Sequence, residues 1–501
     1  MPTRFSQISP QLFRIRGQRV REQGIIRQPT WILLPRMQSI AMALLLSSSA
    51  AVYLALLRLD AVNGIWPVAL FLGAMAALFL LYALAIRVVS HSSAAATWKW
   101  VMAGALLFRL ILIPAGLPAR SGDKAALLAK DLAGSAVTYE RFLLFDNDIW
   151  RYLWDGHATA SGVNPYRFAP ADEAVDRVAE GSAVWSEVRE NVSFPTVPTI
   201  YPALGQMVFR FSHWLAPGSV AVMKMVLVAF DLVAAMFLAL TLRATGQNPA
   251  LAVVYAWNPL VVKVFAGSGH VDAVAVACLA AMGYFLAKAR PGFAGVCLGL
   301  AVLAKLSPLV LLPFFWRRAG WRATVVVFGV VGLGYAPFAG AGPGLVAGLL
   351  TFGKFWQFNA GPYELFRRMG SFVLPLHSPV TPEVAAKTVC GLLFALVLWR
   401  VWRRESPSTA MANEVAPVLG WLLLLSPTAM PWYLTWALPA AVVARQWVWV
   451  WWTATACLSF LVMIDGRERW FILAAEYGIL LVVWWSKSLA GKGLEEKRRT
   501  L

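Results

Sequence analysis

Long apolar runs, separated by short polar or basic connections, dominate the hydrophobic pattern of this chain. Most runs are close to the roughly 20 residues that cross a bilayer as a helix, and they lack the alternation of a transmembrane β-barrel. The pattern therefore predicts an all-α polytopic membrane protein with about 12 to 14 transmembrane helices. The predicted helical spans are residues 38–57, 65–86, 98–117, 219–242, 248–266, 270–288, 292–315, 321–340, 383–402, 413–427, 431–444, 446–464 and 469–485.

One of these spans, 292–315, is expected to be broken. Basic residues flank it on both sides, so a single crossing would place positive charge on both faces of the membrane. Its middle reads Lys305-Leu-Ser-Pro308, and a proline there interrupts helical hydrogen bonding. We expect two half-helices that meet near the external surface. The alternative is one simple span that violates the charge rule.

Basic clusters at the ends of the apolar runs predict the orientation of the chain. Because Lys and Arg are enriched in cytoplasmic connections, both termini are expected inside, and the two largest connections, 118–218 and 341–382, are expected outside. The predicted organisation is a basic cytoplasmic tail at 1–36, an extra transmembrane hairpin at 37–97, the main membrane domain at 98–485 and a second basic cytoplasmic tail at 486–501.

Composition agrees with a membrane protein and changes the interpretation of the charge. Hydrophobic residues make up 59% of the chain and charged residues only 14%, whereas about 25% is usual for soluble proteins. The net charge of +19 arises mostly at the ends of apolar runs, so it does not indicate a nucleic-acid partner. The acids are concentrated instead, with 12 of the 25 in residues 118–199. The first large external connection is therefore the expected place for chemistry.

The most distinctive stretch of this connection runs from Phe145 to His157. A helix over 148–155 would place four polar side chains on one face and two tryptophans on another. The polar side chains are Asp148, Arg151, Tyr152 and Asp155, and the tryptophans are Trp150 and Trp154. The segment is either a solvated helix with a self-satisfying Asp/Arg pair or one wall of a functional site. The scarcity of acids elsewhere favours the second interpretation.

Two aspartates at the start of this helix have two possible roles. Asp146 and Asp148 form an Asp-x-Asp pattern, which can ligate a divalent cation such as Mg²⁺ or Mn²⁺. Alternatively, one of them can act as a general base toward a hydroxyl group. The spacing alone does not decide between a metal site and a base.

Ionisable residues within or beside apolar runs are the remaining candidates, because such groups are costly and usually face a cavity or a partner. Lys305 could hold a phosphate, or it could pair with a nearby acid. His270 and Asp272 stand at a predicted helix N-terminus, where they either cap the helix or reach the same cavity as Asp148. Lys263 could also contact a phosphate, but a lysine that extends to the membrane interface is the favoured interpretation.

Short motifs between about residues 100 and 445 occur in the order found in one family of membrane enzymes. They are Asp148-Ile-Trp-Arg-Tyr-Leu-Trp-Asp-Gly156, Gly162-Val-Asn-Pro-Tyr-Arg-Phe-Ala-Pro170, Tyr201-Pro-Ala-Leu, Trp257-Asn-Pro-Leu, Gly267-Ser-Gly-His-Val-Asp272, Ala304-Lys-Leu-Ser-Pro308, Phe358-Asn-Ala-Gly361 and Pro431-Trp-Tyr433. In these motifs the chain resembles the GT-C superfamily of membrane glycosyltransferases, in particular the bacterial family 87-like and polyprenol-phosphate-mannose-dependent mannosyltransferases. It departs from them at Asn147, where relatives often have an acid, and at Ser307, where they have a tyrosine.

The resemblance implies a GT-C-like helical bundle with a catalytic first external loop. Asp148 would be the general base, with Asp146 as a helper or metal ligand, and Arg151 and Lys305 would bind the donor phosphate. The residues expected to contact the substrates are Trp150, Trp154, Asp155, Tyr166, Arg167, Tyr201, His270, Asp272, Asn359, Trp432 and Tyr433.

The implied reaction is transfer of a sugar, mannose by resemblance, from a polyprenyl-phosphate donor to a glycan or glycolipid acceptor. It would proceed with inversion at the external face of a bacterial inner membrane. A transporter or flippase of lipid-linked sugars is the rival interpretation, because it would share the apolar spans, the cavity lysine and the aromatic residues. A transporter would more often show an internal repeat, and none is evident in the sequence.

Overall fold

A computed structural model describes residues 35–59, 64–118, 124–134, 137–141, 143–375, 379–404 and 410–481. Apart from residues 35 and 36, the two predicted basic tails lie outside this part of the chain. Within it the structure is helical, and the only strand-like pairings are two isolated bridges. The prediction of an all-α polytopic membrane protein is confirmed.

Six helical segments in the described part are long and apolar enough to cross a membrane, and a bent pair would make a seventh. The six are α1 (Pro35–Leu56), α2 (Ile65–Ser90), α8 (Val220–Ala244), the run of η4 (Ser307–Leu311), α13 (Leu312–Tyr335) and η5 (Ala336–Ala341), α16 (Pro382–Arg403), and the run of α19 (Trp447–Thr455) and η7 (Ala456–Ile464). Five shorter apolar helices accompany them: α11 (Asp272–Ala287), α12 (Pro291–Ala304), α14 (Gly344–Phe355), α17 (Ala412–Leu424) and the segment Trp470–Leu481. The expected 12 to 14 crossings therefore require the shorter helices to cross as well.

The predicted single span 248–266 is bent. It consists of η2 (Pro249–Ala252) with α9 (Val253–Ala256), followed by α10 (Pro259–Val262) with η3 (Lys263–Ser268), and the two halves meet at 60°. The cause is local, because Asn258 caps the second half by accepting hydrogen bonds from the backbone of Leu260 (3.0 Å) and Val261 (3.3 Å). Pro259 then occupies the first helical turn, where its missing N–H costs nothing.

The predicted break at Lys305 is confirmed. Helix α12 ends at Ala304, Lys305 has an extended backbone, and the chain turns again at Gly320, whose φ of 78° favours glycine. Helix α12 then packs closely on the part of α13 after Gly320. A Cβ on Gly295 would lie 2.5 Å from the carbonyl oxygen of Ala323, and one on Gly334 would lie 2.4 Å from Leu303. Since the paired residue numbers rise together, these helices run parallel, and residues 307–319 lead back before Gly320. The run Ser307–Ala341, which qualifies as a span by length and composition, is therefore not one straight helix.

Gly295→Val is expected to destabilise the protein by about 1–3 kcal/mol, because the new side chain would force α12 away from the α13 backbone. The measurement is thermal unfolding of the purified protein in detergent. Gly329→Val is the matched control, since a Cβ at that position of α13 meets nothing within 4 Å. Equal melting temperatures for the two variants would contradict the close approach.

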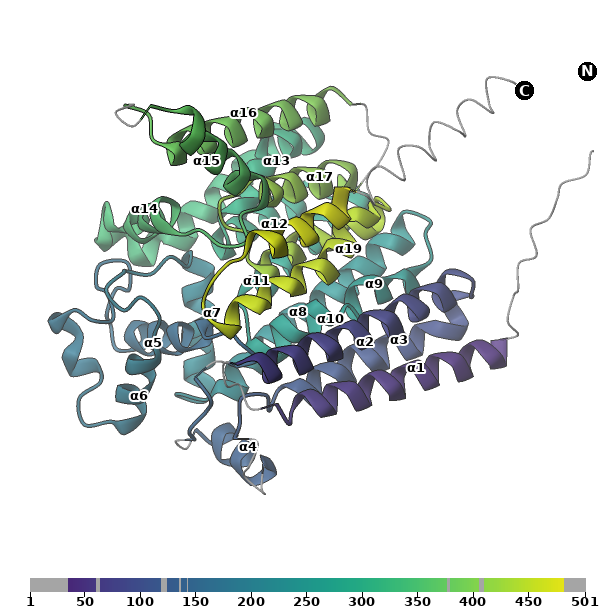
Figure 1. The fold of residues 1–501 in the computed structure, drawn as a ribbon, viewed down its shortest axis with the longest axis horizontal. Helices are drawn as coiled ribbons and strands as arrows, with labels where there is room; N and C mark the ends of the chain where they lie inside the picture. The colour runs from purple at the N-terminus through teal and green to yellow at the C-terminus, as the bar shows by residue number, and fades with distance from the viewer. Residues whose placement is uncertain are drawn as a thin grey trace, which may run out of the picture.

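The two large connections lie at the same end of the helical bundle (Figure 1). The first contains α4, α5, α6 and α7, and the second contains α14 and α15. Their bounds, with those of the other elements, are α3 (Ala94–Leu112), α4 (Lys124–Leu132), α5 (Asp148–Ala160), η1 (Glu173–Val178), α6 (Ala183–Asn191), α7 (Ala203–Leu215), α15 (Gly361–Val373), η6 (Pro431–Trp436) and α18 (Leu438–Val443). This end of the bundle also carries the break at Lys305 and the start of η6, and a cavity opens between them.

Candidate active site

A cavity of about 240 Å³ lies where α5, the loop before α7, the Lys305 break and η6 meet. Seven of the predicted site residues line it: Asp146, Asp148, Arg151, Tyr201, Lys305, Trp432 and Tyr433. A second cavity of about 650 Å³ adjoins the first, and both are lined by Ile200, Tyr201, Lys305, Phe352, Trp356 and Tyr433. The rest of the second wall is mostly aliphatic, with Leu306, Leu309, Val310, Leu349, Leu422 and Leu423. We call the first cavity the polar cavity because charged side chains, Asp146, Asp148 and Arg151, stand among its apolar lining. It continues into a cavity whose wall, within the described part of the chain, shares only one charged residue with it, Lys305, at their boundary.

Asp148 is the first residue of α5 and lines the polar cavity with its side chain 30% exposed. A carboxylate in the first turn of a helix is stabilised by the partial positive charge of the helix N-terminus. This position gives a carboxylate access to the cavity, as a general base requires.

Asp146 lies behind Asp148 and is almost completely buried. Its carboxylate forms an ion pair with Lys263 and accepts a hydrogen bond from the Ser268 hydroxyl (2.8 Å). The preceding residue, Phe145, has a φ of 71°, a left-handed conformation that is costly for a bulky side chain and directs the chain inward at this point. Burial alone would raise the pKa of the Asp146 carboxyl, but the charges of Lys263 and His270 hold it well below its usual value.

The surroundings of the two aspartates bear on the alternative that they ligate a divalent cation. Among the described residues, no group of three or more His, Cys, Asp or Glu side chains is arranged to hold a metal ion. The Asp146 carboxylate already has Lys263 and Ser268 as partners. Asp146 is thus engaged in an ion pair, and ligation of a cation by the Asp-x-Asp pair stays a prediction.

His270 connects the two aspartates. Its Nε2 lies 3.4 Å from Asp146 Oδ2, and its Nδ1 lies 3.6 Å from Asp148 Oδ2. The ring stacks on Trp432 with a centroid distance of 3.8 Å and an interplanar angle of 17°. His270 is 1% exposed and lies behind the cavity wall, so it contacts the acids rather than the cavity.

Lys305 is held in place by an acid and by aromatic rings. Its Nζ lies 3.3 Å from Asp272 Oδ1 and 4.4 Å from the centroid of the Tyr433 ring. The second partner of Asp272 is the indole N–H of Trp436, which donates to the same oxygen at 2.7 Å. Lys305 pairs with an acid, as one alternative predicted, and it also faces the two cavities, while phosphate binding by Lys305 stays a prediction.

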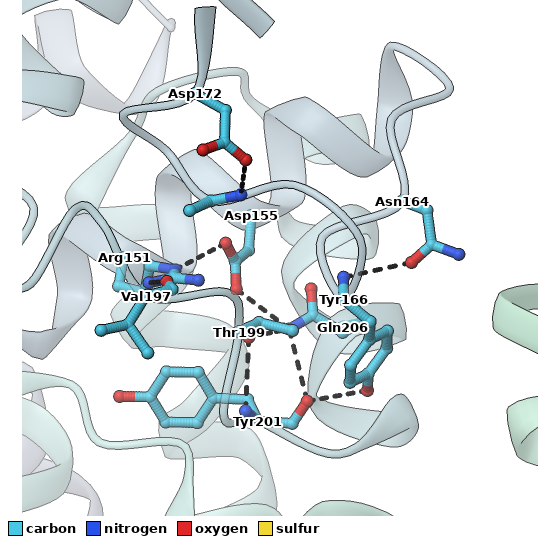
Figure 2. Close-up of polar contacts among 10 residues, drawn as sticks. Arg151, Asp155, Asn164, Tyr166, Asp172, Val197, Thr199, Tyr201 and Gln206 are labelled. Atoms are coloured by element: carbon cyan, nitrogen blue, oxygen red, sulfur yellow. Dashed lines mark hydrogen bonds and ion pairs between the residues drawn. The ribbon is translucent and has the colours of Figure 1, made fainter. Parts of the chain in front are cut away.

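Arg151 joins α5 to the loop before α7 through hydrogen bonds (Figure 2), and this loop lines the cavity. Its Nε donates to Asp155 at 2.7 Å and its Nη1 donates to the carbonyl of Val197 at 3.0 Å. The other Asp155 oxygen accepts from the Gln206 amide at 3.0 Å, and that amide also donates to Thr199 at 2.9 Å. Arg151 Nη2 is buried without a hydrogen-bond partner among the described residues, and the side chain lines the cavity.

Residues 142–319 match the family model described as alpha-(1->6)-mannopyranosyltransferase, N-terminal domain. The resemblance to GT-C mannosyltransferases is confirmed. The matched region contains charged residues that line or lie behind the polar cavity, namely both aspartates, Arg151, Lys263, His270 and Lys305. The protein is therefore a multi-pass membrane glycosyltransferase with a mannosyltransferase domain. No curated protein and no solved structure matches the chain.

Eight predicted site residues of this glycosyltransferase do not line the cavity: Trp150, Trp154, Asp155, Tyr166, Arg167, His270, Asp272 and Asn359. Asp155, His270 and Asp272 hold Arg151, the two aspartates and Lys305 respectively, as described above. The others support the fold or lie at the surface, and each has an identifiable partner.

Trp150 and Trp154 are packed in the core beneath α5, so they do not offer a ring face to a sugar. The indole N–H of Trp150 donates to the carbonyl of Arg141 at 2.8 Å. The hydroxyl of Tyr166 donates to the carbonyl of Tyr201 at 2.8 Å, and Tyr166 is buried (Figure 2).

Arg167 is exposed and lies over the ring of Phe168. Asn359 has a φ of 50°, and its amide donates to Glu476 at 3.0 Å. It therefore joins the second large connection to the last helical segment.

Several contributors to the site were not anticipated from the sequence. Lys263 pairs with Asp146 instead of extending to the interface, and the Ser268 hydroxyl donates a hydrogen bond to the same carboxylate. At the cavity rim, Asn147 donates to the Ser193 hydroxyl at 2.5 Å, and Trp356 packs against Phe194. An ionisable residue in an apolar run was the available signal for Lys263, because such residues usually face a partner or a cavity.

Proposed function

We propose that this glycosyltransferase moves mannose from a polyprenyl-phosphate donor to a hydroxyl of a glycan or glycolipid acceptor, with inversion and with Asp148 as general base. The proposal rests chiefly on one observation, which is that Lys305 stands where a polar cavity containing Asp148 meets an apolar cavity. A donor whose negatively charged phosphate joins an apolar chain to a polar sugar fits that arrangement. The basic ends of the apolar runs favour an external site and cytoplasmic termini, in the inner membrane of a bacterium.

The donor fits the two chambers in one orientation. Its isoprenoid chain would lie in the apolar cavity among leucine side chains, where apolar burial favours it. Its phosphate would lie at the boundary, within reach of Lys305 and of the unpartnered Nη2 of Arg151. Cations placed there stabilise the negative charge that develops on the departing phosphate. The mannose would then lie in the polar cavity near Asp148.

The chemical step requires one base. The acceptor oxygen bonds to the anomeric carbon while the bond from that carbon to the phosphate oxygen breaks, and polyprenyl phosphate leaves with the electron pair. The acceptor proton passes to Asp148, whose carboxylate lines the cavity, whereas Asp146 is buried in its ion pair. The matched family's description names an alpha linkage, and an inverting enzyme forms this linkage from a donor with a beta anomeric bond.

Recognition of the sugar would depend on three of the aromatic residues that line the polar cavity. These are Tyr201, Trp432 and Tyr433. One face of Trp432 is covered by His270, and one side of Tyr433 is covered by Lys305. Trp432 is therefore the ring whose other face a sugar would contact, because Tyr433 also stacks on Trp436 with a centroid distance of 4.5 Å.

Lys305→Met is expected to raise the KM for the polyprenyl-phosphate donor about 10- to 100-fold, because a charge-assisted contact to phosphate contributes about 1.5–3 kcal/mol. The measurement is the initial rate of mannosyl transfer against donor concentration. Lys354→Met is the matched control, since Lys354 is exposed on α14 and lines neither cavity. An unchanged KM in Lys305→Met would remove Lys305 from the phosphate site.

The decisive experiment measures transfer of radiolabelled sugar by purified protein with a crude lipid acceptor fraction. Polyprenyl-phosphate mannose, polyprenyl-phosphate glucose and a nucleotide-activated mannose are compared as donors, with and without a chelator. We expect transfer from the first donor alone, and no effect of the chelator. Transfer from the nucleotide sugar would overturn the lipid donor, and flipping of the donor lipid in liposomes without any transfer would favour a transporter.

A further inference from the structure

Four charged side chains of alternating sign lead from the interior of the bundle to the polar cavity. In order they are Lys263, Asp146, His270 and Asp148. Side-chain exposure is 0% for Lys263, 6% for Asp146 and 1% for His270, and it reaches 30% only at Asp148. We call these four residues the charge row. Only its last member has the exposure that a substrate requires.

The geometry of His270 shows what links the row to the cavity. Both ring nitrogens face carboxylates, at 3.4 Å and 3.6 Å, which is beyond good hydrogen-bond length. As a result, neither nitrogen has a hydrogen-bond partner among the described residues. An imidazole buried in this way is costly unless it interacts with those two carboxylates. Stacking on Trp432 fixes the plane of the ring, so a small movement within that plane would shorten both contacts.

We propose that His270 is a positioning residue, which as an imidazolium bridges Asp146 and Asp148 and keeps the Asp148 carboxylate directed at the acceptor hydroxyl. This inference rests on the proposed role of Asp148 as general base. It differs from the sugar-contact role that the family resemblance implied for His270, because His270 lies behind the cavity wall.

The electrostatics of the row support a charged imidazole. Burial alone would lower the pKa of His270, but the neighbouring carboxylates of Asp146 and Asp148 outweigh it and raise the pKa above its usual value. Lys263 in turn keeps Asp146 ionised. Each charge in the row therefore has a neighbour of opposite sign, which is how buried charges are accommodated.

The other titratable groups beside the charge row are either neutral or paired with each other. Three phenols face it, those of Tyr152, Tyr201 and Tyr433, and burial raises the pKa of each well above its usual value, so they stay neutral. Two further charged residues at this end of the cavity, Lys305 and Asp272, pair with each other. His270 is therefore the group beside Asp148 whose charge changes most readily with pH.

The test is the pH dependence of mannosyl transfer by His270→Gln, which keeps a polar side chain but removes the positive charge. Loss of the cation beside the base should move the acid limb of the pH–rate profile upward by about 1 pH unit. We expect kcat to fall about 10- to 100-fold through misplacement of the base, with the donor KM within about 2-fold of wild type. A role in packing alone would not move the acid limb.

His157→Gln is the matched control. His157 also stacks on a tryptophan, Trp185, at 3.7 Å and 2°, but one ring nitrogen faces the carbonyl of Val178 and the residue does not line the cavity. Its acid limb should coincide with that of wild type. Asp148→Asn, measured in parallel, separates the two proposals. If Asp148→Asn is inactive and the acid limb of His270→Gln is unshifted, the role of His270 is overturned, but Asp148 remains the proposed general base. If Asp148→Asn is active, the assignment of Asp148 as general base is overturned.

A second measurement keeps the inference testable if His270→Gln fails to fold. The chain has five histidines, so ¹³C-labelled imidazoles can be titrated by NMR in wild type and in Asp148→Asn. We expect one histidine to titrate above the usual range in wild type and at lower pH in the variant, because it has lost one of its two carboxylates. Identical titrations of all histidines in the two proteins would overturn the bridge.

Discussion

Asp148→Asn is expected to lower mannosyl transfer about 10²- to 10⁴-fold, the range typical for loss of a general base. Asparagine has nearly the same shape and polarity as aspartate but cannot take the proton of the acceptor hydroxyl. Because the side chain is 30% exposed at the cavity, the substitution leaves no buried charge without a partner. The variant should therefore reach the membrane and melt like wild type.

The measurement is transfer of radiolabelled mannose from polyprenyl-phosphate mannose at saturating donor. Asp176→Asn serves as the control, because Asp176 lies in the same large connection but forms a half-exposed ion pair with Arg189 away from the cavity. It should retain wild-type activity. If Asp148→Asn turned over at the wild-type rate, another group would have to accept the proton.

The helical architecture was largely predictable, because the length of an apolar run shows directly whether it can cross the membrane as a helix. The break at Lys305 was predictable as well, because basic residues on both sides of one span and a proline in its middle are both visible in the sequence. The bend at Asn258 was not. It depends on an asparagine side chain that caps the second half-helix, and a run interrupted by one such residue still has the composition of a span.

Helical spacing predicted which residues of α5 share a face, but not what that face contacts. Arg151 and Asp155 pair with each other, as the simpler alternative proposed, yet Arg151 still lines the cavity. Trp150 and Trp154 were expected to stack on sugar, and they are packed in the core instead. Periodicity cannot distinguish an aromatic residue that faces a cavity from one that faces a neighbouring helix.

The charge row shows why the ion pair between Lys263 and Asp146 could not be predicted from one amino-acid sequence. Lys263 and Asp146 are 117 residues apart, and no local pattern joins a lysine in an apolar run to an acid in a distant connection. The motifs that carried the resemblance did mark the right segments. His270 and Asp272 lie in one such motif, and both act by holding other residues, namely the two aspartates and Lys305. A motif can therefore identify the site without separating the residues that touch substrate from those that support them.

Lys263→Met is expected to destabilise the protein by about 3–5 kcal/mol, because it removes one partner of a buried ion pair and leaves the other charged. Lys263 is fully buried and the Asp146 side chain is 6% exposed, so water cannot replace the lost cation. The loop before α5 would then lose its attachment to η3. Thermal unfolding in detergent should show a clearly lower melting temperature than wild type, whereas Lys288→Met, at an exposed lysine that follows α11, should melt like wild type.

The double variant Lys263→Met/Asp146→Leu separates lost charge pairing from lost packing. Replacing both members of a buried pair by apolar side chains is often neutral, so the double variant should recover most of the stability that the single variant loses. It should nevertheless transfer mannose more slowly than wild type, because His270 would retain only Asp148 as a carboxylate neighbour. A double variant less stable than Lys263→Met would mean that the lysine stem, which lies over the ring of Phe460, contributes more than its charge. Recovery of stability without recovery of rate would show that one buried pair both fastens the loop to the bundle and charges the residue beside the base.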